Sequence, residues 1–513
     1  MQTESSVSHS SSPLSSTENS ATGRRSLLEQ PFLAWAAIIG LFGFTIIGCI
    51  AGAGSLMRLA FPMGSLVVAI YLYIFHPIFY INFNWWIWCT APFLRRLGDY
   101  YRGQFDESSL MLTAPYLVTF VCVWTLFRQF PKVHQTGDIP FVMAGGAVFF
   151  ALFVGVMNNP TSTVIRTFLD WMPPILFGLH ISTSWRLYPK LKETTQTIFI
   201  WIALIAGGYG IHQYMVAPEW DVYWLEAVGN VSFGLPAPQQ MRVWSTMNSP
   251  PQFACVMMAA LILLFVCKNP LRLPAAGAGY LAFLLSLVRA AWAGWVVGIL
   301  TLVVSLKSSL QIRLIATIVC MTLLVVPLTF IEPFDEVIGE RVESFTNIQE
   351  DSSYEARAAT YSENLGVALT GLLGQGLGST WVLKPNGQPE RVALDSGILD
   401  TFFTLGWFGG FPYILGILLL TFNQVRGDEG RTDPFATAAR SITMSFLAIL
   451  TLGPFMLGLA GIVMWGFMGF GMAARKYHIH QRQSIFQQQL KAIASANRLA
   501  ASRALNAEKE TPF

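Results

Sequence analysis

The 513-residue sequence has few charged residues and none of the cysteine pairs that typically bind metal. Only 12% of its residues are Asp, Glu, Lys or Arg, the net charge is +3, and no basic cluster suggests a nucleic-acid partner. The six cysteines are scattered through apolar segments without a Cys-x-x-Cys spacing. We therefore predict that they are small core residues, with no metal or redox site and no cofactor.

Long apolar runs make up most of the sequence. Hydrophobic residues account for 53% of the chain and the mean hydropathy is +0.50, and a soluble domain cannot bury so many runs of membrane-spanning length. The sequence thus predicts an all-α polytopic membrane protein with about 12–14 transmembrane helices. The candidate spans are roughly 31–52, 63–83, 109–127, 139–157, 165–182, 196–215, 252–267, 274–287, 290–306, 312–330, 397–421, 438–456 and 459–474.

Basic residues between the spans predict the orientation of the chain, because Lys and Arg gather in cytoplasmic loops. Four pairs are predicted to be cytoplasmic: Lys268 with Arg272, Lys307 with Arg313, Arg426 with Arg431, and Arg475 with Lys476. This places 216–250 and 331–396 outside. Arg95, Arg96 and Arg102 also suggest a cytoplasmic loop, and the alternation of sides then fails by one. Either the run from 63 to 93 contains a re-entrant or interfacial piece, or a span is miscounted.

These features divide the chain into five predicted regions. They are a disordered cytoplasmic tail at 1–30, an N-terminal transmembrane bundle at 31–330, a large external loop at 331–396, C-terminal transmembrane helices at 397–474 and a cytoplasmic amphipathic tail at 475–513. In the last region Phe486, Leu490 and Ile493 recur at helical spacing near basic residues. This pattern predicts a helix lying on the anionic cytoplasmic leaflet; a loosely ordered, solvated tail is the alternative.

The loop 331–396 is the most polar long segment, with 15 charged residues of which 11 are acidic. Ser352 and Glu355 have the spacing of a capping box, which predicts a helix that begins there. Three glycines in 374–378 follow it and predict a tight loop, since their spacing matches neither a P-loop nor a dinucleotide-binding motif. We expect function to concentrate in this loop, where a polytopic protein meets water-soluble chemistry.

Four arginines are candidates for binding phosphate. Arg289 interrupts an apolar stretch, where an ionisable group costs at least ~2.5 kcal/mol by insertion scales and faces a polar cavity or a partner. Arg242 directly precedes a predicted span, and Arg341 and Arg357 lie in the external loop. A guanidinium binds phosphate oxygens in bidentate fashion and stays charged when desolvated. The alternative for each arginine is an ion pair with a loop carboxylate, or a position at the membrane interface.

Carboxylates are the candidate acids and bases, because neither 216–250 nor 331–396 contains a histidine. Asp395 directly precedes the predicted span that begins at 397, which makes it the first candidate for a general base. Glu343 and Glu355 are the next candidates. Most of the other acidic residues are predicted to be solvated surface.

Four segments, taken in order, resemble the superfamily of O-antigen ligases and Wzy-type polymerases. They are RVWSTMNSPPQFA at 242–254, LSLVRAAWAGWVVGIL at 285–300, ERVESFTNIQEDSSYEARAATYSENLGVALTGLLGQGLGS at 340–379 and LDSGILDTFFTLGWFGGFPYI at 394–414. Arg289 stands at the position of the family's Ser-Arg pair, where Val288 replaces the usual serine. The resemblance covers roughly residues 205–420.

This resemblance implies a metal-independent, inverting glycosyltransferase of the C type in the bacterial inner membrane. Such a polymerase joins undecaprenyl-pyrophosphate-linked repeat units of an O-antigen or exopolysaccharide on the external face. Arg242, Arg289, Arg341 and Arg357 are then expected to bind the pyrophosphate, with Arg289 also catalytic. Asp395 or Glu355 is expected to take the proton of the attacking hydroxyl. The implied partners are the lipid-linked oligosaccharide, membrane lipids, and a chain-length regulator and a flippase of the same pathway.

Two alternatives remain open at this point. A ligase would transfer finished glycan to lipid A core or protein, and ligases of this superfamily typically carry a histidine in the large external loop. The loop 331–396 has none, which favours a polymerase. A lipid-linked oligosaccharide flippase could have a similar number of spans, but most transporters are built from repeated halves. The sequence shows no internal repeat and only one long external loop.

Overall fold

Within the described residues the regular structure is helical apart from one small antiparallel ribbon, which confirms the predicted all-α class. The computed structural model describes residues 30–305, 311–312, 315, 364–383, 389–391, 394, 396–427, 429 and 433–509. The helices are α1 (Pro31–Ile50), α2 (Gly54–Phe75), α3 (Pro77–Arg102), α4 (Ala114–Phe120), α5 (Val123–Gln129), α6 (Val133–Thr136), α7 (Ile139–Asn158), α8 (Thr161–Thr183), α9 (Tyr188–Val216), α10 (Glu219–Val228), α11 (Pro250–Leu264), α12 (Arg272–Leu285), α13 (Arg289–Ser305), α17 (Gly397–Val425), α18 (Pro434–Ile449) and α19 (Gly458–Lys509). Short 3₁₀ turns are Leu110–Thr113, Phe130–Lys132, Trp185–Leu187, Val231–Phe233 and Leu450–Leu452. The strands β1 (Trp381–Leu383) and β2 (Pro389–Arg391) pair Trp381 with Arg391.

Eight helices within the described residues are long and apolar enough to cross a membrane. They are Pro31–Ile50, Gly54–Phe75, Leu110–Thr136, Ile139–Asn158, Trp185–Val216, Gly397–Val425, Pro434–Leu452 and Gly458–Ala500. The helices α11, α12 and α13 are apolar but shorter. The helices α3 and α8 are also long, at 26 and 23 residues, but they are not among these eight. The chain is a multi-pass membrane protein, and the exact number of its spans stays a prediction.

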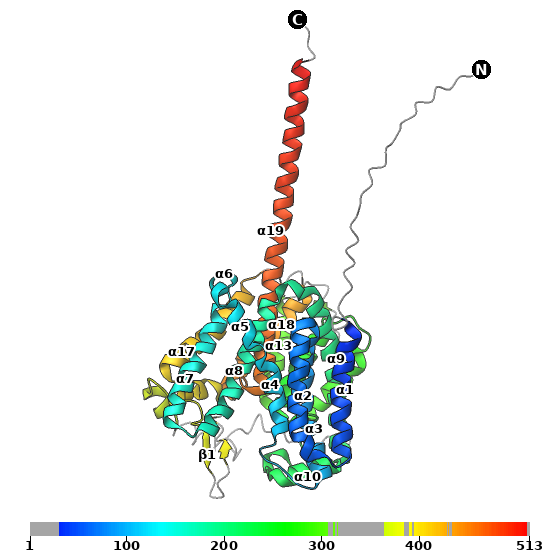
Figure 1. The fold of residues 1–513 in the computed structure, drawn as a ribbon, viewed down its shortest axis with the longest axis vertical. Coiled ribbons are helices and arrows are strands. Elements are labelled where there is room, and N and C mark those ends of the chain that lie inside the picture. Colours follow the sequence, from blue (N-terminus) through cyan, green and yellow to red (C-terminus); the bar gives the residue numbers. More distant parts are fainter. Residues whose placement is uncertain are drawn as a thin grey trace, which may run out of the picture.

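Most helices run side by side along one axis (Figure 1). Charged contacts lie at both ends of the bundle. At one end α10 lies across the bundle, and Arg96 of α3 pairs with Asp221 of α10. We call this the α10 end. At the opposite end α19 leaves the bundle, and its Lys476 pairs with Asp138, the residue before α7. We call this the α19 end.

The boundary between α2 and α3 corrects the predicted orientation of the first third. The run predicted as one span at 63–83 is broken at His76, whose backbone is non-helical (φ −138°, ψ 65°). The cause is Pro77, because a proline disfavours helical geometry in the residue before it. Consequently α3 is a separate helix that carries Arg95 and Arg96 to the α10 end. They therefore do not share a side with Arg475 and its neighbours, and the miscounted span explains the failed alternation.

The described members of the basic loops predicted to share one side gather at one end, whereas Lys307, Arg313 and Arg431 lie outside the described residues. Lys192, Lys268 and Asp433 line a single cavity at the α19 end, and Arg475 donates to the backbone and side chain of Asn423 at 2.6 and 2.7 Å. The segment that contains α10 lies at the opposite end. This grouping agrees with the prediction from positive charge; which end faces the cytoplasm stays a prediction.

Glycines allow close approaches that larger residues would prevent. A Cβ on Gly178 of α8 would lie 2.5 Å from the backbone oxygen of Trp465 on α19, so these two helices pack backbone to backbone. The core is otherwise made of large apolar side chains, among them the fully buried Trp85 and Trp171. Five of the six cysteines lie in the described residues, and all five are buried and free, as predicted.

A glycine-rich loop inserts beside a break in α17. The helix is interrupted at Gly406 (φ 64°), and the loop supplies hydrogen bonds there: Gln375 N donates to Phe403 O at 2.9 Å and Gly376 N to Thr404 O at 3.0 Å. Gly374 has a positive φ of 73°, like the two other glycines of 374–378. The predicted tight loop is thus confirmed, and its backbone satisfies carbonyls that the break in the helix would leave unpaired.

The C-terminal tail continues α19 instead of forming a separate helix. Residues 458–509 form one helix that extends from the bundle roughly along its axis (Figure 1). The segment after Gly471 contains neither glycine nor proline up to Lys509, so nothing in the sequence interrupts the helical hydrogen bonding. The tail is thus helical, and its position relative to the cytoplasmic leaflet stays a prediction.

Candidate functional site at the α10 end

The structure describes two of the six predicted site residues, Arg242 and Arg289. The other four lie outside the described residues: Arg341, Glu355, Arg357 and Asp395. Most of the predicted span at 312–330 and the start of the predicted loop helix lie outside them as well, whereas residues 364–370 are helical. The candidate site is therefore built from the residues around Arg242 and Arg289.

Arg289 is the first residue of α13 and is half-buried. The turn before it joins α12 to α13 and places the buried Ser286 and Val288 against the core. The first N–H groups of a helix have no partner within the helix and form its positive dipole end. Arg289 therefore adds a full positive charge to a position that already favours anions.

The Arg242 guanidinium donates three hydrogen bonds to backbone carbonyls. Its Nε donates to Ser286 O at 3.0 Å and its Nη2 to Leu287 O at 3.2 Å, both in the turn before Arg289. Its Nη1 donates to Ser232 O at 3.0 Å. These bonds use three of the five N–H donors of the guanidinium. The two predicted arginines are thus brought to the same turn, and Arg242 supports the backbone there.

A buried ion pair anchors the segment that contains Arg242. Arg96 Nε lies 2.8 Å from Asp221 Oδ1, and both side chains are fully buried. The Arg96 guanidinium also donates to the backbone oxygens of Ser245 and Met247. Asp221 Oδ2 accepts a hydrogen bond from Tyr209 at 2.6 Å. A single arginine therefore links α3, α10 and the segment before α11.

Gln213 of α9 completes this network. Its Nε2 donates to Asp221 at 2.9 Å, and its Oε1 accepts from the backbone N–H groups of Trp244 and Ser245 at 3.1 and 2.8 Å. Ser245 has a positive φ of 54°, which is uncommon for a residue with a side chain. Its hydroxyl donates to Ala206 O at 2.6 Å. Contacts with Arg96, Gln213 and the carbonyl of Ala206 therefore stabilise the irregular backbone at Ser245.

A second charged cluster lies at the same end, at the C-terminus of α3. Asp99 pairs with Arg95 at 2.8 Å and with Arg102 at 3.1 Å, and Arg58 pairs with Asp106 at 2.5 Å. Arg95 also donates to the backbone oxygen of Asp106. These contacts join α2, α3 and the following loop. They are intramolecular pairs, which points to a structural role.

Asp400 is a buried carboxylate that the sequence analysis did not select. It lies in the first turn of α17, it is 2% exposed, and Thr404 donates to its Oδ1 at 3.1 Å. A carboxylate in the first turn of a helix after a serine N-cap is a common capping arrangement. Its position in the sequence therefore gave no reason to select Asp400 as a site residue. Its helix packs against α7 and α19, whereas α13 packs against α11 and α18. Asp400 and Arg289 thus lie on separate helices.

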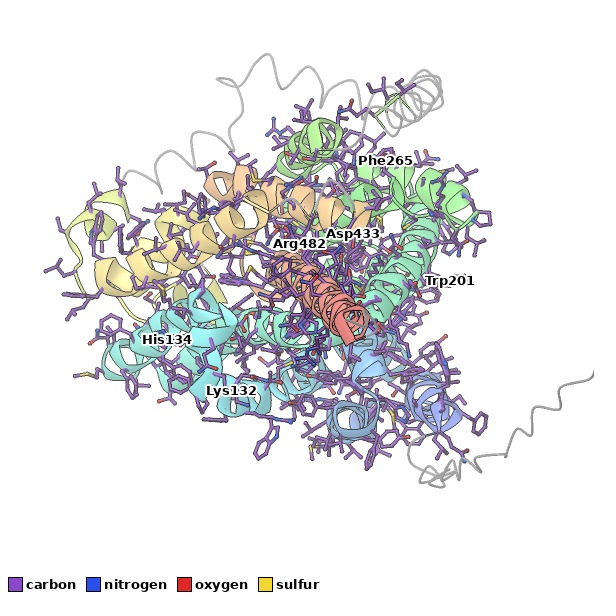
Figure 2. The ribbon with its side chains drawn as sticks, turned by 90° about the horizontal axis from the view of Figure 1, so that it is seen from above. Lys132, His134, Trp201, Phe265, Asp433 and Arg482 are labelled. Carbon is purple, nitrogen blue, oxygen red and sulfur yellow. The ribbon has the colours of Figure 1, made fainter. Side chains whose placement is uncertain are left out.

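The α19 end has its own charged network, around Asp433. Asp433 Oδ2 accepts from Tyr188 at 2.9 Å and lies 3.2 Å from His478 and 3.4 Å from Lys192. Burial alone would raise the pKa of Asp433, but the His478 hydrogen bond, the Lys192 charge and the Tyr188 hydroxyl lower that pKa to about 2. Figure 2 shows Asp433 and Arg482 near the middle of this end, around α19. This network joins α9, α18 and α19.

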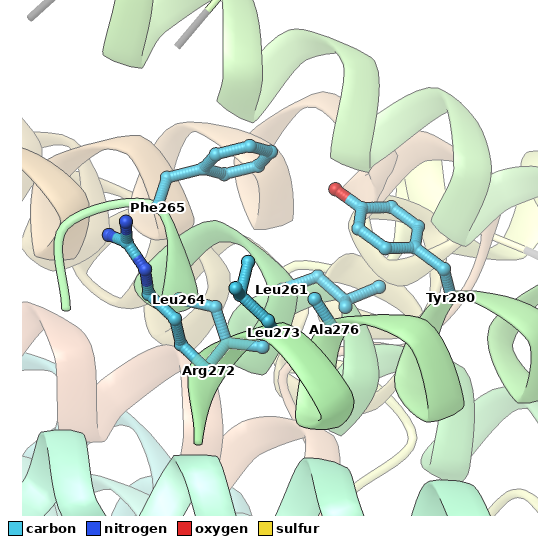
Figure 3. A pocket seen from close by; sticks show the side chains of 7 residues that line it. All are labelled: Leu261, Leu264, Phe265, Arg272, Leu273, Ala276 and Tyr280. Carbon is cyan, nitrogen blue, oxygen red and sulfur yellow. The ribbon is translucent and has the colours of Figure 1, made fainter. Parts of the chain in front are cut away.

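Two cavities of the described residues lie away from Arg242 and Arg289. One cavity of about 60 Å³ between α11 and α12 has Arg272 and Tyr280 at opposite edges with leucines between them (Figure 3). It is far smaller than a typical ligand site, and Arg272 donates to the backbone oxygen of Cys267. A groove of about 660 Å³ between α1, α3 and α9 is mainly apolar and includes Trp35 and Trp201. Neither cavity includes a phosphate-binding group at the α10 end.

Comparisons with known proteins add no relative. No protein-family model matches the chain, and neither the curated proteins nor the solved structures contain a significant match. Within the described residues, no group of three His, Cys, Asp or Glu side chains lies close enough to hold a metal ion. The predicted metal-independent reaction stays a prediction, and the function is argued from the residues alone.

Proposed function

We propose that the protein is an inverting glycosyltransferase that polymerises saccharide repeat units carried on undecaprenyl pyrophosphate in a bacterial inner membrane. The lipid diphosphate binds at the α10 end beside the N-terminus of α13. Arg289 stabilises the negative charge that develops as the diphosphate leaves. The donor reaches this position from the bilayer, which accounts for a site at one end of a membrane bundle.

One observation supports this proposal most. Arg242 and Arg289 are distant from each other in the sequence, and the structure brings both to the turn between α12 and α13. A half-buried arginine on a helix N-terminus is suited to a desolvated phosphate. The four sequence segments that resemble the polymerase superfamily include both arginines, so the two arguments concern the same place.

The reaction is a single displacement at the anomeric carbon. The hydroxyl oxygen of the acceptor sugar forms the new bond to this carbon while the bond to the diphosphate oxygen breaks, and the configuration inverts. A carboxylate takes the hydroxyl proton, for which Asp395 and Glu355 are the proposed residues. The diphosphate leaves with the bonding electron pair, and its charge is balanced by Arg289 and by the proposed loop residues Arg341 and Arg357.

Purified full-length protein in lipid nanodiscs, incubated with a synthetic undecaprenyl-pyrophosphate-linked repeat unit, tests the proposal. Neither metal nor nucleotide is added, and products are analysed by mass spectrometry. We expect a ladder that grows by whole repeat units, and a loss of at least about 100-fold in rate for Arg289→Ala, as when one oxyanion-stabilising donor is removed. Arg166→Ala is the matched control, because the contacts of this arginine of α8, a hydrogen bond to the Ser108 hydroxyl at 2.8 Å and a position over the Trp381 ring, involve neither Arg242 nor the turn before Arg289.

Two results would contradict the proposal. One is the absence of any ladder from well-folded protein. The other is a normal ladder from Arg289→Ala. A deletion strain separates the related functions: single repeat units on lipid A core indicate a polymerase, long chains that are not attached to core indicate a ligase, and lipid-linked units retained on the cytoplasmic side indicate a flippase.

A further inference from the structure

The turn that precedes Arg289 is strained. Leu287 has a positive φ of 55°, a conformation that a residue with a side chain rarely adopts and that is strained. The direction in which α13 starts depends on this residue, because only Val288 separates it from Arg289. Something must therefore hold the turn in place.

Arg242 holds this turn from the outside. Two of its donors bind the carbonyls of Ser286 and Leu287, at 3.0 and 3.2 Å, and the next residue, Val243, donates its backbone N–H to Leu285 O at 3.1 Å. Three consecutive carbonyls are thus bound by two consecutive residues. The planar guanidinium can do this because its donors are fixed relative to one another, whereas a lysine ammonium would reach one carbonyl at a time.

The segment around Arg242 is itself fixed to the rest of the α10 end. Arg96 binds the carbonyls of Ser245 and Met247, and Gln213 binds the N–H of Ser245. A continuous set of contacts therefore leads from the buried pair of Arg96 and Asp221, through 242–247, to the strained turn at Leu287.

We propose that Arg242 is a positioning residue for Arg289: it stabilises the positive-φ turn at Leu287 and so fixes where α13 presents the Arg289 guanidinium. This inference rests on the proposed function, in which Arg289 contacts the diphosphate. It replaces the simpler expectation that Arg242 itself binds phosphate. Its consequence is specific: if the turn no longer needs support, Arg242 is no longer needed.

Glycine at position 287 provides that test, because glycine adopts positive φ without strain. Arg242→Lys keeps the charge but loses the planar guanidinium that binds two carbonyls at once. We expect kcat in the ladder assay to fall about tenfold, which corresponds to about 1.4 kcal/mol, and KM for the lipid-linked unit to stay nearly unchanged. The double variant Arg242→Lys, Leu287→Gly should recover most of kcat. Ala217→Gly is the matched control, since Ala217 also has a positive φ (51°) at the end of α9, and it should not restore activity.

A direct phosphate contact by Arg242 gives the opposite pattern. KM would rise because a ground-state contact is lost, and Leu287→Gly would restore nothing; this result overturns the inference. Thermal unfolding of the wild type, Arg242→Lys, Leu287→Gly and the double variant gives a readout without substrate. In this measurement Leu287→Gly should stabilise the Arg242→Lys protein more than it stabilises the wild type. Should wild-type protein make no ladder while this stability rescue occurs, the proposed function fails and the support of the turn stands. A ladder without rescue in either assay means that the support is wrong.

Discussion

The two ends of the bundle use buried charge in different ways. At the α10 end, Arg96 and Arg242 direct most of their donors to backbone carbonyls of irregular segments. At the α19 end, Lys476 and His478 contact the carboxylates of Asp138 and Asp433, which lie next to helix starts. The first arrangement fixes the shape of loops, and the second joins helices to one another.

This difference follows from what each end must stabilise. Buried backbone groups outside regular structure need partners from side chains, and the rigid fork of arginine can satisfy several carbonyls at once. Between regular helices the backbone is already satisfied, so a single ammonium or imidazole on a carboxylate is enough. We therefore expect changes at the α10 end to alter both shape and activity, and changes at the α19 end to alter stability alone.

The largest expected effect is that of Arg96→Leu. It would leave the fully buried Asp221 without its cation, which typically destabilises a protein by about 3–5 kcal/mol, and it would release the carbonyls of Ser245 and Met247. Thermal unfolding in detergent and the ladder assay should both show a severe loss. Asp221→Leu in the same chain should recover part of the stability, because an apolar pair replaces a lone charge, but not the activity. Arg166→Leu, at a partly exposed arginine, serves as control; an Arg96→Leu protein with wild-type unfolding would refute the argument.

The sequence predicts features that depend on neighbouring residues better than features that depend on residues far apart in the chain. The fold class followed from apolar runs, and the tight loop followed from three nearby glycines. The break at His76 was missed because hydropathy averaged over a window does not register the local effect of Pro77. The continuity of the tail with α19 was not predicted, because amphipathic spacing describes a face of a helix and not where the helix begins.

The sequence provided Arg242 and Arg289 as candidate site residues, but it did not predict the contacts that these residues make. The cost of a charge in an apolar run identified Arg289, and the sequence order suggested Arg242. Two of the three carbonyls that Arg242 binds belong to a turn some 45 residues further along, and no local pattern reveals them. Arg96 was assigned to the wrong end because charge alone predicts sidedness, whereas its partner Asp221 is visible only after folding.

A smaller effect is expected for Lys476→Met at the α19 end. Lys476 Nζ lies 2.6 Å from Asp138 Oδ1 and also donates to Ser182 Oγ at 2.9 Å. Because the lysine side chain is 13% exposed, we expect a destabilisation of roughly 2–3 kcal/mol, at or below the lower end for a buried pair.

Asp138→Asn should restore much of this loss, since the amide removes the uncompensated charge. Lys491→Met, in the exposed part of α19, is the control. If the α19 end affects stability alone, the Lys476→Met protein that remains folded should have the wild-type rate in the ladder assay. A rate reduced as strongly as that of Arg96→Leu would show that both ends act on the site.

The smallest effect, and the one that depends on pH, concerns Asp433. Its folded-state pKa of about 2 lies below the ordinary aspartate value of 3.8, so its network contributes stability that is fully present above pH 4. This stability is lost as the pH falls towards 2, where the carboxylate becomes protonated in the folded state too. The shift corresponds to about 2 kcal/mol at most.

Asp433→Asn should therefore unfold at a lower temperature than wild type at pH 7, and the difference should shrink as the pH falls below about 4. Glu193→Gln, at an exposed side chain nearby, controls for net charge. A difference near zero at pH 7 would contradict this: because Asn caps a helix about as well as Asp, it would mean that Asp433 acts only as the cap of α18, through its bond from Phe435 N at 3.1 Å, and that its negative charge beside Lys192 adds little to the joint between the helices.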